Sequence, residues 1–458
     1  MNQRCFAFIA AILILSCNNT NRTVNKEAYK WPENIKPPVA EKKPKEFTAH
    51  GDTRIDNYFW MNDFFKKGPD STKAVDYLKA ENEYLDTMMA GIKDFQQALF
   101  VELKGRIKEK DESVPYKSNG YWYYLKYTEG SQYPVYCRKK ETLSAPEEII
   151  HDANKAAEGK SYYSTGGLVV SDNNQLLAIS EDDVSRRLYK LRFKNLVTGE
   201  YFPETIINTQ GESYAWAADN KTVFYILKDV TTLLGFQVWR HEVGTDPAKD
   251  VMIYEEKDNR YDLEVERTKS KKYVVINSEL SEQSSEYRIL DAAKPAGDFS
   301  IFQPRIMGLV YDIDHYNDKF YIRTNLDAAN FRLMECGLEK TGKENWKEVI
   351  PHRQDVYLSD LTVFKNHLVL SERKDGLMQL RVIKQDDKSE HYIQFDETAY
   401  SAFVGNNPDF NTNLLRFNYT SMITPYSVFD YNMDTKEKEL KKQQEVTGGY
   451  DKNEYVTE

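Results

Sequence analysis

The stretch Tyr214–Arg240 reads YAWAADNKTVFYILKDVTTLLGFQVWR and carries the pattern that decides the fold. Three short runs are rich in aromatic and β-branched residues: Tyr214–Trp216, Val223–Ile226 and Gln237–Arg240. Segments with turn-forming residues, such as Ala218–Lys221, separate them. Runs of this kind favour β-strands, and clusters of Asp and Asn between them favour turns. The stretch therefore predicts a meander of antiparallel strands.

Similar units recur along most of the chain, before and after this stretch. The other units cover residues Tyr121–Tyr136, Leu168–Leu191, Leu263–Ile289, Val310–Met334, Leu361–Ile383 and Leu414–Tyr431. Seven units between residues 113 and 445 average about 48 residues each, which is typical of four-stranded propeller blades. We therefore predict an all-β protein with a seven-bladed β-propeller over residues 113–445. A tandem of β-sandwiches is the alternative, but one unit is too short for a sandwich.

Residues 47–112 are expected to form a short α-helical N-terminal extension. Val75, Leu78, Leu85 and Met89 share one face of a predicted helix that begins near Pro69–Ser71. A second amphipathic helix is predicted after Asp94, with apolar residues at a spacing of four; these are Phe95, Leu99, Leu103 and Ile107. Each apolar stripe needs a cover, which is either the propeller or a domain outside this sequence.

The first residues have the features of a bacterial lipoprotein signal. An apolar run of about ten residues, Phe6–Leu15, is too short to span a bilayer and suits a signal peptide. It ends at Ser16-Cys17, which resembles a lipobox, so residues 1–17 are predicted to be a signal peptide with lipidation at Cys17. Residues 18–46, rich in Asn, Lys, Glu and Pro, are expected to be a tether. An ordinary cleaved signal peptide is the alternative.

Composition excludes several classes of protein. The chain has 458 residues, 72 acidic and 62 basic, with a formal net charge of −10, which argues against a nucleic-acid partner. A hydrophobic fraction of 40% is too high for a disordered chain. Four cysteines cannot make a disulfide scaffold, and Cys137 and Cys336 are expected to be separate structural cysteines.

Recognisable catalytic motifs are lacking in the sequence. A Gly-x-Ser-x-Gly turn does not occur, and the nearest stretch, Gly211–Ala215, is interpreted as the entry of a strand. The seven histidines include no His-Glu-x-x-His motif, and we expect them at surfaces or strand edges. Gly166-Gly167 and Gly448-Gly449 are not phosphate loops, because neither precedes Lys-Ser/Thr. We therefore assign no catalytic, metal-binding or cofactor-binding residue and expect no cofactor.

Several motifs resemble the prolyl oligopeptidase family, and oligopeptidase B in particular. They lie within His50–Trp60, Tyr77–Asn82, Gly105–Pro115, Gln237–Glu256 and Lys442–Asp451. The similarity extends from about residue 37 to the end of the sequence. The resemblance implies that a propeller caps an α/β-hydrolase domain, whose Ser, Asp and His triad follows the propeller in the chain.

No triad residue can therefore be placed on this sequence, and residues 446–458 are expected to be a linker toward a hydrolase domain that is absent here. The resemblance implies the noncatalytic, substrate-gating N-terminal portion of an exported serine endopeptidase that acts on short peptides. Its expected partners are short peptides, a hydrolase domain in cis or trans, and a membrane through the lipid anchor. Its expected location is the periplasmic side of a bacterial envelope. The alternative is a stand-alone lipoprotein propeller that binds a peptide or protein.

Overall fold

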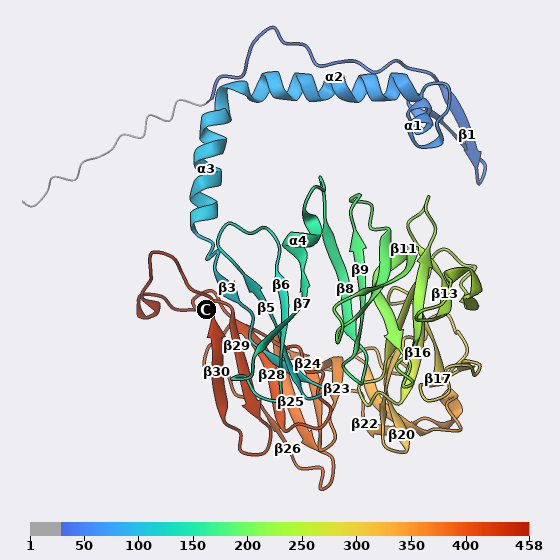
Figure 1. Ribbon diagram of the computed structural model, residues 1–458, viewed down its shortest axis with the longest axis vertical. Helices are drawn as coiled ribbons and strands as arrows, with labels where there is room; N and C mark the ends of the chain where they lie inside the picture. Colours follow the sequence, from blue (N-terminus) through green and yellow to red (C-terminus); the bar gives the residue numbers. More distant parts are fainter. Residues whose placement is uncertain (1–28, 458) are drawn as a thin grey trace, which may run out of the picture. The chain divides into compact units, whose positions relative to one another are not determined.

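The computed structural model describes residues 29–457, which divide after Gly105 into an N-terminal unit and a larger β-sheet unit (Figure 1). The predicted signal peptide, Cys17 and residues 18–28 of the predicted tether lie outside the described residues. No helix among the described residues is long and apolar enough to cross a membrane.

The N-terminal unit contains both predicted helices and a hairpin that the sequence did not suggest. Its main elements are β1 (Lys45–Ala49), β2 (Asp52–Asp56), α1 (Asp63–Lys66), α2 (Ser71–Met89) and α3 (Lys93–Gly105). Among the residues of these helices only Ala74 is buried. Leu78, Leu85, Leu99 and Leu103 are 41–56% exposed, so the elements of this unit do not cover the two apolar stripes.

The β-sheet unit, from Arg106 onward, consists of consecutive antiparallel sheets. The first sheet contains β3 (Asp111–Glu112), β4 (Tyr116–Ser118), β5 (Tyr121–Tyr127), β6 (Val135–Lys140) and β7 (Glu147–Asp152). The long sheet contains β8 (Ser164–Val170), β9 (Leu176–Asp182), β10 (Tyr189–Asn195), β11 (Tyr201–Trp216), β12 (Thr222–Lys228), β13 (Gly235–Glu242) and β14 (Val251–Glu255). A short helix, α4 (Ala153–Ala157), separates the two.

Four sheets of four strands follow. The third sheet contains β15 (Asp262–Arg267), β16 (Tyr273–Leu280), β17 (Ser284–Asp291) and β18 (Ser300–Ile301). The fourth contains β19 (Tyr311–Tyr316), β20 (Lys319–Thr324), β21 (Arg332–Gly337) and β22 (Lys347–Ile350). The fifth contains β23 (Tyr357–Val363), β24 (His367–Lys374), β25 (Leu377–Lys384) and β26 (Glu390–Tyr392). The last contains β27 (Ser401–Val404), β28 (Leu414–Thr420), β29 (Ser427–Asn432) and β30 (Lys438–Gln443).

The prediction of seven separate four-stranded blades is wrong. Counted by hydrogen-bonded sheets, the described part of this unit has five blades of four or five strands, together with the undivided seven-stranded long sheet. The reason is β11, which pairs with β10 from Tyr201 to Thr209 and with β12 from Thr209 to Trp216. One continuous strand thus joins what the sequence pattern suggested were two units.

Gly211 explains why the sequence was misleading at this point. It was interpreted as the entry of a strand, whereas it lies in the interior of β11. A Cβ atom at this position would lie 2.6 Å from the ring of Tyr189, so only glycine lets the strand pass this ring without displacing it.

Hydrophobic cores lie between neighbouring sheets, and side chains join the two ends of the series. One core combines Phe224 of the long sheet with Leu263 and Ile276 of the third sheet. At the ends, Nη1 of Arg416 in the last sheet donates hydrogen bonds to the carbonyl oxygens of Val114 and Pro115 beside the first sheet, at 3.4 and 2.8 Å. Figure 1 shows β30 close to β3, so the sheets close into a ring.

Candidate functional site

The first strands of three neighbouring sheets carry acidic side chains that interact with one another across the sheets. Propeller blades surround a central channel, here called the tunnel, which is the space that such strands share. In β15, Asp262, Glu264 and Glu266 are exposed and alternate with the buried Leu263 and Val265. In the next two sheets, β19 contributes Asp312 and Asp314 and β23 contributes Asp360. We call these six carboxylates the acidic wall. The alternation of acidic and apolar residues in Asp262–Glu266 was a sequence signal for the acidic wall. A strand pattern alone does not reveal which face of the strand lines the tunnel.

The electrostatics show that these carboxylates share one confined space. Glu266 is exposed to solvent, but protein atoms surround it, and this partial desolvation, followed by repulsion from Glu264, Asp314 and Asp312, raises its pKa to about 7. Burial also raises the pKa of Asp314 to about 6, although the backbone N–H groups of His315 and Lys269 donate hydrogen bonds to it. Glu266 is therefore only partly ionised near neutral pH.

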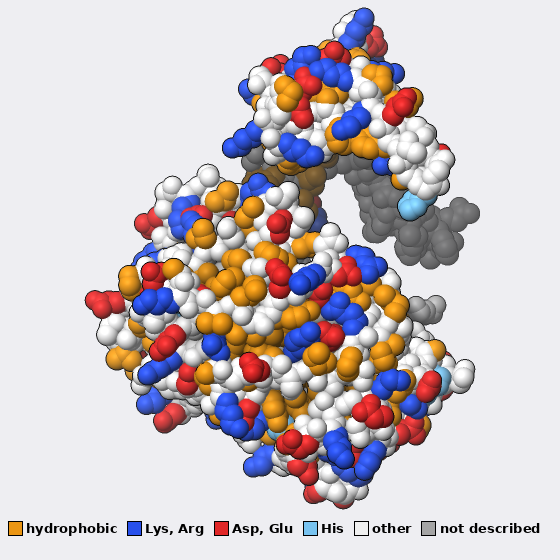
Figure 2. Space-filling view, turned by 90° about the vertical axis from the view of Figure 1, so that its right-hand side faces the viewer, with side chains coloured by type: hydrophobic (Ala, Val, Ile, Leu, Met, Phe, Trp, Pro, Cys, Tyr) orange, Lys and Arg blue, Asp and Glu red, His pale blue; other side chains and the backbone are white. Residues whose placement is uncertain are grey.

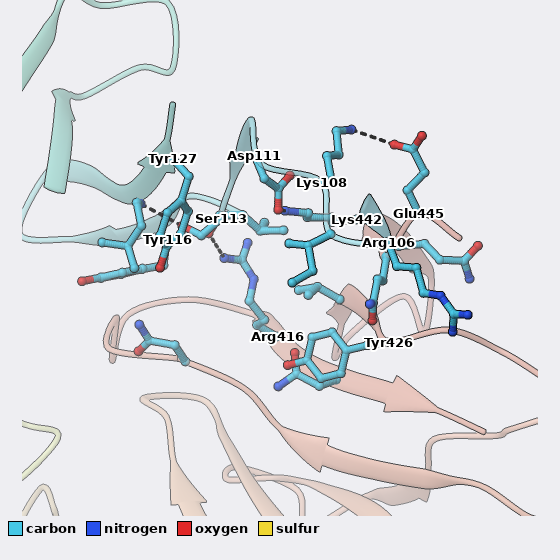
Figure 3. A pocket seen from close by; sticks show the side chains of 18 residues that line it. Arg106, Lys108, Asp111, Ser113, Tyr116, Tyr127, Arg416, Tyr426, Lys442 and Glu445 are labelled. Carbon is cyan, nitrogen blue, oxygen red and sulfur yellow. Dashed lines mark hydrogen bonds and ion pairs between the residues drawn. The ribbon is translucent and has the colours of Figure 1, made fainter. Parts of the chain in front are cut away.

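A cavity of about 900 Å³ lies where the first and last sheets meet. Figure 3 shows it between the segment that enters the sheets and the segment that leaves them. Lys442 Nζ lies 2.5 Å from Asp111 Oδ2 across this junction, and Lys108 Nζ lies 2.9 Å from Glu445 Oε2. Arg416 also pairs with Asp430, at 2.8 Å from Nε to Oδ1. The charged groups of the cavity thus mostly bind one another and hold the ring closed.

Ser270 and His315 form a serine–histidine pair, the combination that serves as nucleophile and base in serine hydrolases. Ser270 Oγ lies 2.8 Å from His315 Nδ1. A catalytic histidine needs a second group that orients its other nitrogen, but His315 Nε2 has no hydrogen-bond partner within residues 29–457. The rings of Tyr273 and Phe320 pack against His315, and burial lowers its pKa. The pair therefore has a structural role in the turn that contains Ser270.

The expectation that histidines lie at the surface is wrong for four of the seven. The buried ones are His151, His241, His315 and His367. His241 is fully buried, and its Nδ1 lies 2.7 Å from Asp250 Oδ1, while its Nε2 lies 3.7 Å from Glu204 Oε1. Some of their polar partners come from distant parts of the chain, such as Glu204 for His241 and Asp434 for His367, and a pattern search cannot detect these contacts.

Other residues singled out in the sequence have structural positions. Cys137 and Cys336 are both buried and free, which confirms that they are separate structural cysteines. The described residues contain no group of three or more His, Cys, Asp or Glu side chains that could hold a metal ion. On the face that Figure 2 shows, Lys and Arg side chains are intermixed with Asp and Glu.

Comparison with known proteins agrees with the resemblance seen in the motifs. Residues 37–444 match the family described as prolyl oligopeptidase, N-terminal β-propeller domain. The chain is 39% identical over 439 residues to dipeptidyl aminopeptidase BI of Pseudoxanthomonas mexicana, which covers 92% of this chain and 60% of the relative. It is 29% identical over 432 residues to protease 2 of Moraxella lacunata, covering 93% of this chain and 61% of the relative.

Solved structures give the same result. Oligopeptidase B from Leishmania major superposes with a TM-score of 0.84 at 27% identity, covering 92% of this chain and 62% of that one. Oligopeptidase B from Trypanosoma brucei, in a closed form with covalently bound antipain, has a TM-score of 0.83 at 28% identity, with the same coverage. The chain thus spans 60–62% of the length of these relatives. It belongs to the prolyl oligopeptidase family, and its β-sheet unit corresponds to the N-terminal β-propeller domain of that family.

Proposed function

We propose that this chain is the noncatalytic, substrate-gating portion of an exported serine endopeptidase that acts on short peptides. The observation that carries the proposal is the closed ring of sheets, in which Arg416 and Lys442 fasten the last sheet to the first. A closed ring leaves only narrow paths, which an extended peptide can follow and a folded protein cannot. Size selection of this kind needs no binding energy from the propeller.

The catalytic residues would belong to an α/β-hydrolase domain, supplied in the same polypeptide or by another one. Support comes from the named relatives, which are peptidases and are longer than this chain. The exposed stripes of α2 and α3 are a surface that such a domain would cover, because contiguous apolar surface favours burial in a partner. Closure of the two parts on each other would then control access to the triad.

We further propose that the protein is exported and anchored through lipid on Cys17 at the periplasmic side of the envelope. The support is the apolar run before Ser16-Cys17 in the sequence. Mass spectrometry of the protein isolated from its native membrane would show Cys17 as the modified N-terminal residue. An N-terminus elsewhere, or an unmodified Cys17, would contradict this part of the proposal.

The proposed activity can be tested with one cleavable sequence in two settings. A quenched fluorescent peptide of about ten residues would be compared with the same sequence placed in a loop of a stable folded protein. The enzyme would be the protein isolated from native cells, together with any hydrolase that accompanies it. We expect cleavage of the free peptide only, and its loss after treatment with a serine-directed fluorophosphonate.

The controls separate the proposal from its alternative. The folded substrate, once denatured, should become cleavable, which shows that access and not sequence limits the reaction. Equal cleavage of the folded and free forms would contradict gating by the propeller. Tight binding of the peptide without hydrolysis in any preparation would contradict the peptidase proposal and favour a stand-alone peptide-binding propeller.

A further inference from the structure

The turn Thr268–Lys272, which joins β15 to β16, contacts sheets well beyond its own neighbours. Toward the start of the ring, Lys271 Nζ lies 2.9 Å from Asp172 Oδ1 in the β8–β9 turn of the long sheet. The same ammonium group donates a hydrogen bond to Asn119 Oδ1 in the β4–β5 turn of the first sheet. Arg267, just before the turn, lies 3.2 Å from the other oxygen of Asp172.

The same turn also reaches in the opposite direction around the ring. The backbone N–H of Lys269 donates to Asp314 Oδ1 in the fourth sheet at 3.2 Å, and Ser270 contacts His315 of the same strand. Lys269 Nζ lies 3.2 Å from the ring centroid of Phe364, in the β23–β24 turn of the fifth sheet. The turn therefore contacts both neighbouring sheets and the sheet beyond each of them.

This set of contacts places the turn across the middle of the ring. The first and fifth sheets lie two positions away from the third sheet, on opposite sides of it. One turn of the third sheet can contact both of them only near the axis of the ring. The partners also lie mostly in turns or at strand ends, such as Asn119, Asp172 and Phe364, so the contacts are made at one end of the tunnel. Lys271 has a left-handed backbone, with φ of 62°, which is suited to a tight turn.

We propose that the turn Thr268–Lys272 is a plug that closes one end of the propeller tunnel, and that the ion pairs of Asp172 with Lys271 and Arg267 act as its latch. Peptides would then reach the acidic wall only from the opposite end. The proposal rests on the proposed function only in naming peptides as the molecules excluded. The side chains of Lys271 and Asp172 are 35% and 31% exposed, so salt should weaken the latch.

The neighbouring charges are consistent with a latch that is closed at neutral pH. Burial opposes the ionisation of Asp172, but Lys271 and Arg267 outweigh this effect and lower its pKa. Lys272 offers a matched comparison within the same turn, because its Nζ lies 3.1 Å from Asp291 of its own sheet. Removing the Lys272 side chain should leave the latch intact.

The test measures which cysteines a tethered maleimide can reach when its carrier protein is too large to enter the tunnel. A maleimide is attached to a folded carrier protein by a linker shorter than β15, whose tunnel-facing part spans about 13 Å. Glu266→Cys places a thiol next to the plug, and Asp262→Cys places one at the other end of the strand. Each is made in the full 458-residue chain, alone and together with Asp172→Asn, Lys271→Ala or Lys272→Ala. Labelled positions are identified by mass spectrometry of the digested protein.

We expect Asp172→Asn and Lys271→Ala to raise the labelling rate at position 266 by about tenfold or more, because local opening controls access. Lys272→Ala should have no such effect, and labelling at position 262 should be equal in all variants. In the chain without latch substitutions, about 1 M salt should also raise labelling at position 266.

Two results would overturn the plug. One is rapid labelling at position 266 while the latch is intact, and the other is an equal increase at positions 262 and 266, which indicates general loosening. Unchanged slow labelling at position 266 in both latch variants would overturn the role of Asp172. The readout is independent of peptide cleavage, so a failed peptidase assay with successful labelling would reject the proposed function and keep the plug.

Discussion

The burial and hydrogen bonds of individual polar residues are the features that neighbouring sequence predicts least well. His151 lies in an outer strand, β7, yet it is buried, with its Nε2 2.9 Å from Tyr163 Oη. The hydroxyl of Tyr163 donates its proton to Glu181 Oε1 at 2.7 Å, so the histidine must be the donor in the other bond. Burial lowers the pKa of His151 to about 4. No sequence pattern links residues 151, 163 and 181, because tertiary packing alone brings them together.

His151 should make the protein less stable in mild acid. Its pKa is about 4 in the folded state and about 6.5 in the unfolded chain, so the unfolded chain binds more protons between these values. The free energy of unfolding should therefore fall as pH decreases from 6.5 to 4, by about 2–3 kcal/mol from this group. Urea denaturation across this range should show a shallower fall for His151→Gln. Parallel pH profiles for the two proteins would contradict the assignment.

At the scale of elements, strand positions were easier to predict than strand connections. The runs centred on Leu263–Val265 and Val223–Ile226 do form β15 and β12, because the alternating apolar residues of the first and the continuous apolar residues of the second must face a core. No strand begins at Gly211, which lies inside β11, and close packing on Tyr189 explains the glycine without a turn. The acidic wall was missed for a related reason: solvent-facing and tunnel-facing positions have the same period.

The Glu266 carboxylate should destabilise the fold above neutral pH. Its pKa of about 7 exceeds that of an unfolded glutamate, so the folded state binds more protons and loses stability as pH rises toward 7. Because solvent screens this exposed side chain, we expect Glu266→Gln to gain only about 1 kcal/mol near pH 8 and nothing near pH 4.

Chemical denaturation at the two pH values checks this expectation. Asp262→Asn, at the other end of the same strand, is the matched control for loss of one negative charge. An equal gain from both substitutions would show that overall charge, and not the confined position of Glu266, is responsible.

For the whole molecule, repetition in the sequence and the family motifs predicted a propeller correctly, while the number of separate blades was wrong. Closure of the ring could not be inferred, because it depends on Arg416 meeting residues about 300 positions earlier in the chain. Its guanidinium group binds Asp430 through Nε and Nη2, at 2.8 and 2.9 Å, and uses Nη1 for the first sheet. One side chain thus links the ends of the domain.

Arg416→Met should loosen the ring and cost about 3–5 kcal/mol, because it also leaves the mostly buried Asp430 without its partner. Hydrogen exchange should become faster in β4 and β28 on either side of the junction. Arg288→Met is the control, because Arg288 pairs with Glu286 of its own strand. Faster exchange throughout the propeller, or in neither strand, would contradict a local role in closure.

The contact of Arg416 with the first sheet depends on side-chain identity at one of its two ends only. Both first-sheet acceptors of Arg416 are main-chain carbonyl oxygens, of Val114 and Pro115, which every amino acid possesses. Drift in the side chain at position 114 leaves its acceptor in place, whereas the donor exists only while an arginine occupies position 416. Inherited variation that breaks this contact should therefore fall at position 416, whereas exchange of the side chain at position 114 should leave the contact intact.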